Sequence, residues 1–301
     1  MSSLAETAPA ETAAGGDPAS LLASLRAELD GLDDALHDTL MRRAEVVGRI
    51  ASLRVKDGVP LRPGREAAIL RRLLARHAGA LPRHGVVRVW RELIAAMTEI
   101  QRPLVIAACV EDDGAALARE QFGALVSLRV HGSPAQALGE VAAGTAAAAV
   151  LPMPAEGEAP ARAWWTGLLH PGKDERRAYV VARLPFWEPR PEGAPRGQAL
   201  VVGGTPPDPS GEDRTLLALE LPPDSSRARL AEALAGAGLQ AGTVIIRRDQ
   251  GAARALADVA GFVSSADPRL AALVPRPAVL GAYAVPVGGS LPPGNPAGAA
   301  R

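Results

Sequence analysis

The chain of 301 residues has few cysteines, lysines and aromatic residues. Its one cysteine, Cys109, can form neither an intramolecular disulfide nor a cysteine-rich metal site, which favours a cytosolic protein. No apolar run approaches the ~20 residues needed to cross a bilayer, and residues 1–18 lack the basic and apolar segments of a secretion signal. The composition therefore predicts a cytoplasmic protein with no membrane partner.

The overall charge balance hides a local excess of basic residues. The whole chain has 33 basic and 33 acidic residues, but residues 20–103 hold 15 basic against 10 acidic residues, a net charge of +5. Only Lys56 and Lys173 are lysines, so a single arginine in this arginine-rich chain carries little information. The basic segment contains one aromatic residue, Trp90, and offers no stacking platform for bases. We expect a small anionic ligand as the partner, and no nucleic acid.

Hydrophobic periodicity predicts three helices in the first third of the chain. Apolar residues step by three and four from Leu22 to Ile50 without a proline, which indicates one helix from Leu21 to about Lys56. Two shorter helices follow, from Pro63 to about Gly79 and from about Gly85 to Pro103. A 36-residue helix extends on the order of 54 Å, so most of its apolar face requires a second chain. We predict a helical homodimer.

After Pro103 the period changes to that of an α/β region. Residues 104–151 read as β-α-β-α-β, with 125–130 taken as a buried strand. Residues 215–284 read as β-α-β-β-α-β, the order of a ferredoxin-like module, with its second helix at 268–273. The predicted fold class is multidomain, an all-α domain followed by an α/β region. Its parts are a disordered tail (1–19), the helical domain (20–103), an α/β region (104–214), the ferredoxin-like module (215–290) and a second disordered tail (291–301).

Polar residues interrupt the apolar stripes of two predicted helices. Arg43 and Arg54 occupy positions of the long helix where apolar residues are expected, and Gln101 follows Met97 by four on the third helix. Arg43 and Arg54 are eleven residues apart, so they share a helix face and lie about 16 Å apart. They can converge on one ligand. Alternatively, Arg43 pairs with an internal acid such as Glu66, or Arg54 reaches solvent near the end of the helix. Taken alone, this pattern leaves both interpretations open.

The order of these residues resembles the all-helical class of chorismate mutases over about residues 20–102. The resemblance rests on LRAELDGLDDALHDTLMRRAEVVGRI, then Arg54, then RPGREAAIL and VVRVWRELIAAMTEIQ. That family carries two arginines and a lysine on its long helix, an Arg-Glu pair opening the second helix and a glutamine closing the third. The matching residues here are Arg26, Arg43, Arg54, Arg65-Glu66 and Gln101.

The resemblance implies a chorismate mutase that needs no metal and no cofactor and works as an intertwined dimer. Arg43, with Arg26 of the partner subunit, would bind the two carboxylates of chorismate, and Arg65 would add positive potential. Arg54 and Gln101 would donate hydrogen bonds to the ether oxygen, and Glu66 would accept one from the ring hydroxyl. Two departures qualify the match: Arg54 stands where the family usually has lysine, and the aspartate common before the Arg-Glu pair is missing.

The region beyond Pro103 resembles a reduced prephenate dehydratase followed by an ACT regulatory module. LADVAGF at 256–262 and VLGAY at 279–283 carry this resemblance. The Thr-Arg-Phe triplet of dehydratases is absent from YVVARLPF at 179–186, and residues 109–114 replace their glycine-rich loop. We therefore expect no dehydratase activity and a structural or regulatory role. Two alternatives stay open: a bifunctional mutase-dehydratase, and a non-catalytic regulator that binds chorismate or an aromatic amino acid.

Overall fold

The computed structural model describes residues 17–53, 61–170, 176–249 and 251–288. The chain divides into two compact units, residues 1–53 and residues 54–301. The predicted disordered tails lie outside the described residues, except that a helix already begins at Pro18. Within the described ranges, no helix is both long and apolar enough to cross a membrane.

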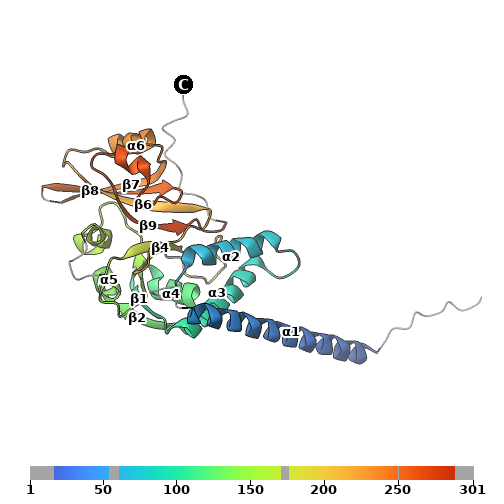
Figure 1. Cartoon of the computed structure of the whole chain (residues 1–301). Coiled ribbons are helices and arrows are strands. Elements are labelled where there is room, and N and C mark those ends of the chain that lie inside the picture. Colours follow the sequence, from blue (N-terminus) through green and yellow to red (C-terminus); the bar gives the residue numbers. More distant parts are fainter. Residues whose placement is uncertain (1–16, 54–60, 171–175, 250, 289–301) are drawn as a thin grey trace, which may run out of the picture. The chain divides into compact units, whose positions relative to one another are not determined.

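The first unit contains one long helix, α1 (Pro18–Ser52), which Figure 1 draws in dark blue. Asp17 caps its first turn by accepting a hydrogen bond from the amide of Ala19 at 3.3 Å, and Pro18 suits the first helical position. None of its residues is buried. Leu40 is partly buried, and the other leucines of the predicted stripe are about half exposed or more, for example Leu29 and Leu32 at 60% each. Helix α1 taken by itself therefore carries an apolar stripe with no core of its own to pack against.

The second unit begins with a helical hairpin made of α2 (Pro63–Arg76) and α3 (Arg83–Gln101). Both helices are strongly amphipathic, and their apolar faces meet around Leu70, Leu74 and Val87. The same cluster includes Phe186 and Ala284 from the sheet region, so the hairpin and the sheet share one hydrophobic core. Residue 103, the predicted domain boundary, therefore does not separate two independent hydrophobic cores. The boundary itself stays a prediction.

One nine-stranded sheet runs through the rest of the unit, in the order β2-β1-β3-β5-β4-β9-β6-β8-β7. Its first half consists of β1 (Val105–Cys109), β2 (Ser127–His131), β3 (Ala148–Pro152), β4 (Tyr179–Leu184) and β5 (Ala199–Gly203). Strands β1, β2 and β3 are parallel, and β5 is antiparallel to both β3 and β4. Helix α4 (Gly114–Phe122) packs on the side chains of Ile106 and Ala108, and α5 (Pro134–Ala143) packs on Ala107. Since neighbouring residues of a strand face opposite ways, the two helices cover opposite faces.

The second half of the sheet is the predicted ferredoxin-like module. It consists of β6 (Asp213–Leu221), α6 (Arg227–Gly236), β7 (Ala241–Asp249), β8 (Ala252–Ala260), the short 3₁₀ segment η4 (Pro268–Ala272) and β9 (Ala278–Ala284). Strand β6 lies between β8 and β9 and is antiparallel to both. Strand β9 also joins β4 through the Val180–Gly281 pair. A Cβ on Gly281 would lie 2.0 Å from the Val180 carbonyl oxygen, so this seam requires glycine.

The predicted fold class is confirmed in its main features, a helical region followed by a mixed α/β region, and two details are wrong. Residues 125–130 do not form a buried strand, because β2 begins at Ser127, lies at the sheet edge and is largely exposed. The predicted second helix of the ferredoxin-like module is only the five-residue segment η4. Its short apolar run buries Leu270 without continuing into a helix.

Candidate functional site

The six predicted site residues are distributed over three helices and one segment that the structure does not describe. Arg26 and Arg43 lie on α1, Arg65 and Glu66 in the first turns of α2, and Gln101 is the last residue of α3. Arg54 lies outside the described residues.

Glu66 is the most deeply buried of the five site residues that the structure describes, with 8% of its surface exposed. Its Oε2 accepts a hydrogen bond from Nη1 of Arg91, on α3, at 2.8 Å. Burial raises the pKa of the Glu66 carboxyl above its usual value, and the positive charge of Arg91 opposes that shift. The pair satisfies two groups that would each be costly to bury alone.

Arg91 is buried as well, with 5% of its surface exposed. Its guanidinium lies over the ring of Phe186, 5.1 Å from the ring centre, and Arg71 lies 6.0 Å from the same centre. Phe186 comes directly after β4 and the proline that ends it, so the sheet region reaches into the hairpin here. An arginine over an aromatic face is held by the ring's negative quadrupole.

The N-terminus of α2 is fixed by the loop that precedes β6. The amide of Arg65 donates to Oδ2 of Asp208 at 3.1 Å, while the Arg65 residue itself is exposed. A Cβ at Gly64 would lie 2.1 Å from the Asp208 carbonyl oxygen, so only glycine allows this approach. The contact orients the first turn of α2, which carries Arg65 and Glu66.

Gln101 lies apart from the Glu66–Arg91 pair. Arg91 and Gln101 are ten residues apart on α3, which separates them by about 15 Å along the helix axis. The Gln101 side chain is half-buried, and its Nε2 donates to the Met97 carbonyl oxygen at 3.3 Å. Within the described part of this unit, no hydrogen bond joins Gln101 to Glu66.

The loop after β1 is acidic and fastened to its own surroundings. Asp112 and Asp113 adopt positive φ angles of 53° and 60°, which are uncommon for residues other than glycine. Arg162 contacts Glu111 at 2.9 Å and Asp112 at 3.0 Å, and the Asp113 carboxylate accepts two backbone amides at 3.1 Å. Strand order reverses at β1, between β2 and β3, the place where doubly wound sheets bind ligands beyond their carboxyl ends. In this chain, the carboxylates of the loop after β1 occupy that position.

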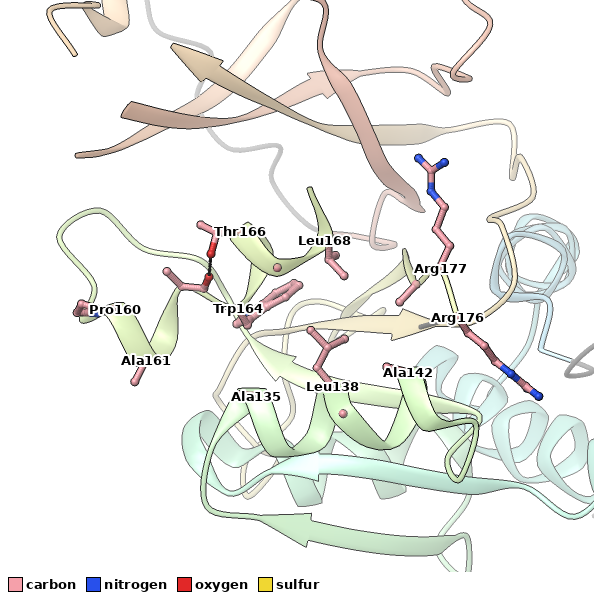
Figure 2. A pocket seen from close by; sticks show the side chains of 14 residues that line it. Ala135, Leu138, Ala142, Pro160, Ala161, Trp164, Thr166, Leu168, Arg176 and Arg177 are labelled. Atoms are coloured by element: carbon pink, nitrogen blue, oxygen red, sulfur yellow. Dashed lines mark hydrogen bonds between the residues drawn. The ribbon is translucent and has the colours of Figure 1, made fainter. Parts of the chain in front are cut away.

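A cavity of about 370 Å³ lies between α5 and two 3₁₀ segments, η2 (Pro160–Arg162) and η3 (Trp164–Leu168). Figure 2 shows Trp164, Leu138 and Leu168 around it, whereas the side chains of Arg176 and Arg177 extend away from Trp164. The Trp164 indole donates to the Pro152 carbonyl oxygen at 2.9 Å. The cavity wall is mainly apolar, and no acid, base or nucleophile points into it from the residues shown in Figure 2.

Other candidate centres do not form within the described residues. No group of three or more His, Cys, Asp or Glu side chains there is placed to hold a metal ion. Cys109 is fully buried at the end of β1, and burial raises the pKa of its thiol, which disfavours the thiolate.

Sequence reasoning missed Arg91 and Phe186. Arg91 left a readable signal, because it follows Val87 by four and precedes Ile94 by three on the apolar stripe of α3. That is the same kind of interruption that drew attention to Arg43. Phe186 left no such signal, since a phenylalanine after a strand is ordinary core composition.

Comparison with known proteins identifies the helical part. Residues 25–102 match the family model of chorismate mutase type II, a range that includes all six predicted site residues. This match confirms the family resemblance of that segment.

The relatives found are larger proteins. A bifunctional chorismate mutase/prephenate dehydratase of Neisseria gonorrhoeae is 36% identical over 87 residues, which cover 29% of this chain and 24% of that protein. The protein of the same description from Stutzerimonas stutzeri is 26% identical over 140 residues, or 44% and 38% of the two chains. The matched segments thus span well under half of these relatives.

Among solved structures, prephenate dehydratase from Streptococcus mutans aligns with 60% of this chain and 98% of its own, at 18% identity and a TM-score of 0.44.

Proposed function

We propose that this chain, whose residues 25–102 match type II chorismate mutases, converts chorismate to prephenate. The observation that carries the proposal is the family match over the segment that holds Arg26, Arg43, Arg65-Glu66 and Gln101 in the expected order. The reaction is a rearrangement within one molecule, so it needs orientation and charge stabilisation and no covalent partner. Side chains that bind carboxylates and donate hydrogen bonds are sufficient for it.

Each proposed residue has one task. Arg43, with Arg26 of the partner subunit, binds the two carboxylates and holds the substrate in its folded conformation. Arg54 and Gln101 donate hydrogen bonds to the ether oxygen as negative charge develops on it. Glu66 accepts a hydrogen bond from the ring hydroxyl. Arg65, itself exposed in the otherwise buried first turn of α2, adds positive potential.

The proposed enzyme is a homodimer, and the apolar stripe of α1 supports this. Arg26 and Arg43 are 17 residues apart on one helix, which places them about 25 Å apart along the axis and about 100° apart around it. One copy of α1 therefore presents only one of them to a small ligand. A second copy supplies the other and also covers the exposed leucines, each worth ~1.5–3 kcal/mol when fully buried.

We further propose that the α/β region does not dehydrate prephenate. Prephenate carries two carboxylates, and the loop after β1 presents Glu111, Asp112 and Asp113 where a doubly wound sheet binds its ligand. Like charges at that place oppose binding of a dianion. The bifunctional alternative draws support from the descriptions of the relatives. The regulator alternative rests on the two departures at Arg54 and before Arg65.

The remaining parts of the proposal concern location and partners. A single cysteine that is buried and unpaired suits a reducing cytoplasm. The sequence carries no signature of a nucleic-acid-binding module, and the proposed partner molecules are chorismate and a second copy of the chain.

Replacing Arg43 by alanine tests the site directly. Arg43→Ala removes a charge-assisted carboxylate contact, and we expect kcat/KM for chorismate to fall by roughly 100-fold or more, with little change in thermal stability. Arg42→Ala is the matched control, because it removes a neighbouring arginine that has no proposed role. Turnover is followed as loss of chorismate absorbance. Equal activity of the Arg43→Ala protein and the wild type would contradict the site assignment.

A further inference from the structure

Arg91 is a cation that the proposed reaction does not use, yet the fold buries it beside the most buried acid of the site. A guanidinium at 5% exposure is costly unless its charge is matched. The matching negative charge is the Glu66 carboxylate, whose Oε2 lies 2.8 Å from Nη1 of Arg91. Arg91 sits on α3 and Glu66 on α2, so the pair also fixes the two helices relative to each other.

Phe186 closes this pair off from water on one side. Its ring lies 5.1 Å from the Arg91 guanidinium and belongs to the same apolar cluster as Leu70 and Val87. Phe186 is itself 7% exposed. Excluding water lowers the local dielectric, which strengthens the attraction between Arg91 and Glu66. A residue of the α/β region thus contributes to the electrostatics of a mutase residue.

Two further charges and one backbone hydrogen bond act on the pair. The negative charge of Asp208, in the loop before β6, raises the pKa of Glu66, and the negative charge of Glu120, on α4, raises the pKa of Arg91. The backbone of Arg62 also interacts with the Glu66 carboxylate. Asp208 opposes the ionised form of Glu66, so Arg91 is the cation that favours it.

We propose that Arg91 is a positioning residue, which holds the Glu66 carboxylate ionised and oriented toward the substrate hydroxyl. Phe186 of the α/β region helps to hold the Arg91 guanidinium in place. The inference rests on the proposed mutase function. A carboxylate offers about four acceptor sites, so the bond to Arg91 leaves Glu66 able to accept a hydroxyl. The α/β region consequently has a role in the first reaction even without a reaction of its own.

The test is the pH profile of kcat/KM for chorismate in the full chain. In Arg91→Met the lowering effect of the cation is lost, while burial and the negative charge of Asp208 still raise the pKa of Glu66, so that pKa rises. We expect the acidic limb of the profile to move up by about one pH unit or more and kcat/KM at neutral pH to fall roughly tenfold or more. Arg91→Lys retains the charge and restores the position of the limb. Arg88→Met removes an exposed arginine from the same helix and leaves the profile unchanged.

A second variant protects the test against loss of folding. Phe186→Leu keeps an apolar side chain but removes the aromatic face, and we expect a smaller shift of the limb in the same direction. An unshifted limb in both a folded Arg91→Met protein and Phe186→Leu overturns the inference. If Arg91→Met does not fold, an unshifted limb in Phe186→Leu overturns it. A wild-type chain that leaves chorismate unchanged contradicts the proposed function instead, so the two failures are distinguishable.

Discussion

Arg214, Asp258 and Tyr283 form a second buried polar network, on neighbouring strands of the ferredoxin-like module. Nε of Arg214 contacts both carboxylate oxygens of Asp258, at 2.9 and 3.0 Å, and the Tyr283 hydroxyl donates to Asp258 at 2.8 Å. Burial raises the pKa of Asp258 and of Tyr283, and Arg214 opposes the shift at Asp258. All three side chains are satisfied by one another, so the network stabilises the module rather than offering a ligand site.

Tyr283→Phe tests this network at the residue scale. The variant leaves a buried carboxylate with one donor fewer, and we expect the free energy of unfolding at pH 7 to fall by about 1–3 kcal/mol. The folded-state pKa of Tyr283 is raised above that of an unfolded tyrosine, near 10. The advantage of the wild type is therefore complete below about pH 10 and is lost as pH rises through the folded pKa.

Denaturant unfolding of both proteins across this pH range measures the difference. Tyr179→Phe serves as the control, because the Tyr179 ring lies under Arg177 at 5.3 Å at the other half of the sheet. Equal stabilities of wild type and Tyr283→Phe at pH 7 would show that the hydroxyl contributes nothing.

The sequence predicts helices and strands correctly where residues close together in the sequence determine the structure. Helix α5 is the second helix of the predicted β-α-β-α-β run, and Ser133 caps its start and Gly144 its end. The edge strand β2 was misjudged because the apolar run from Leu125 to Val130 does not reveal which neighbours a strand will have. Leu125 is in fact 95% exposed. Arg91 shows the same limit, since its interruption of a stripe is visible but its partner is not.

The apolar face of α1 gives a prediction at the element scale. Leu29→Glu places a charge in the middle of the exposed stripe, and we expect a monomer by analytical ultracentrifugation together with a loss of mutase activity. The activity falls because Arg26 of the partner subunit is no longer supplied. Ala27→Glu adds the same charge on the opposite side of the helix and leaves the dimer intact. A dimeric Leu29→Glu protein would place the subunit contact elsewhere.

Across the whole second unit, the helical hairpin and the sheet are joined by contacts between residues far apart in the sequence. Arg71 of α2 donates to the carbonyl oxygens of Glu212, at 3.0 Å, and Val285, at 2.6 Å. Phe186 lies 95 positions after Arg91. Periodicity predicted the order of the elements, and the family resemblance pointed to the six candidate site residues, which stay predictions. The packing of the hairpin against the sheet could not be predicted, because neither periodicity nor resemblance tells which residues distant in the sequence pack together.

The central claim is that the chain is a mutase whose second region has no dehydratase activity. The most direct test incubates the purified full chain with chorismate at neutral pH, identifies the products by NMR and assays phenylpyruvate in the same sample. We predict loss of chorismate with prephenate as the sole product. Phenylpyruvate would contradict the interpretation of the acidic loop after β1, and chorismate that remains unchanged would contradict the claim itself.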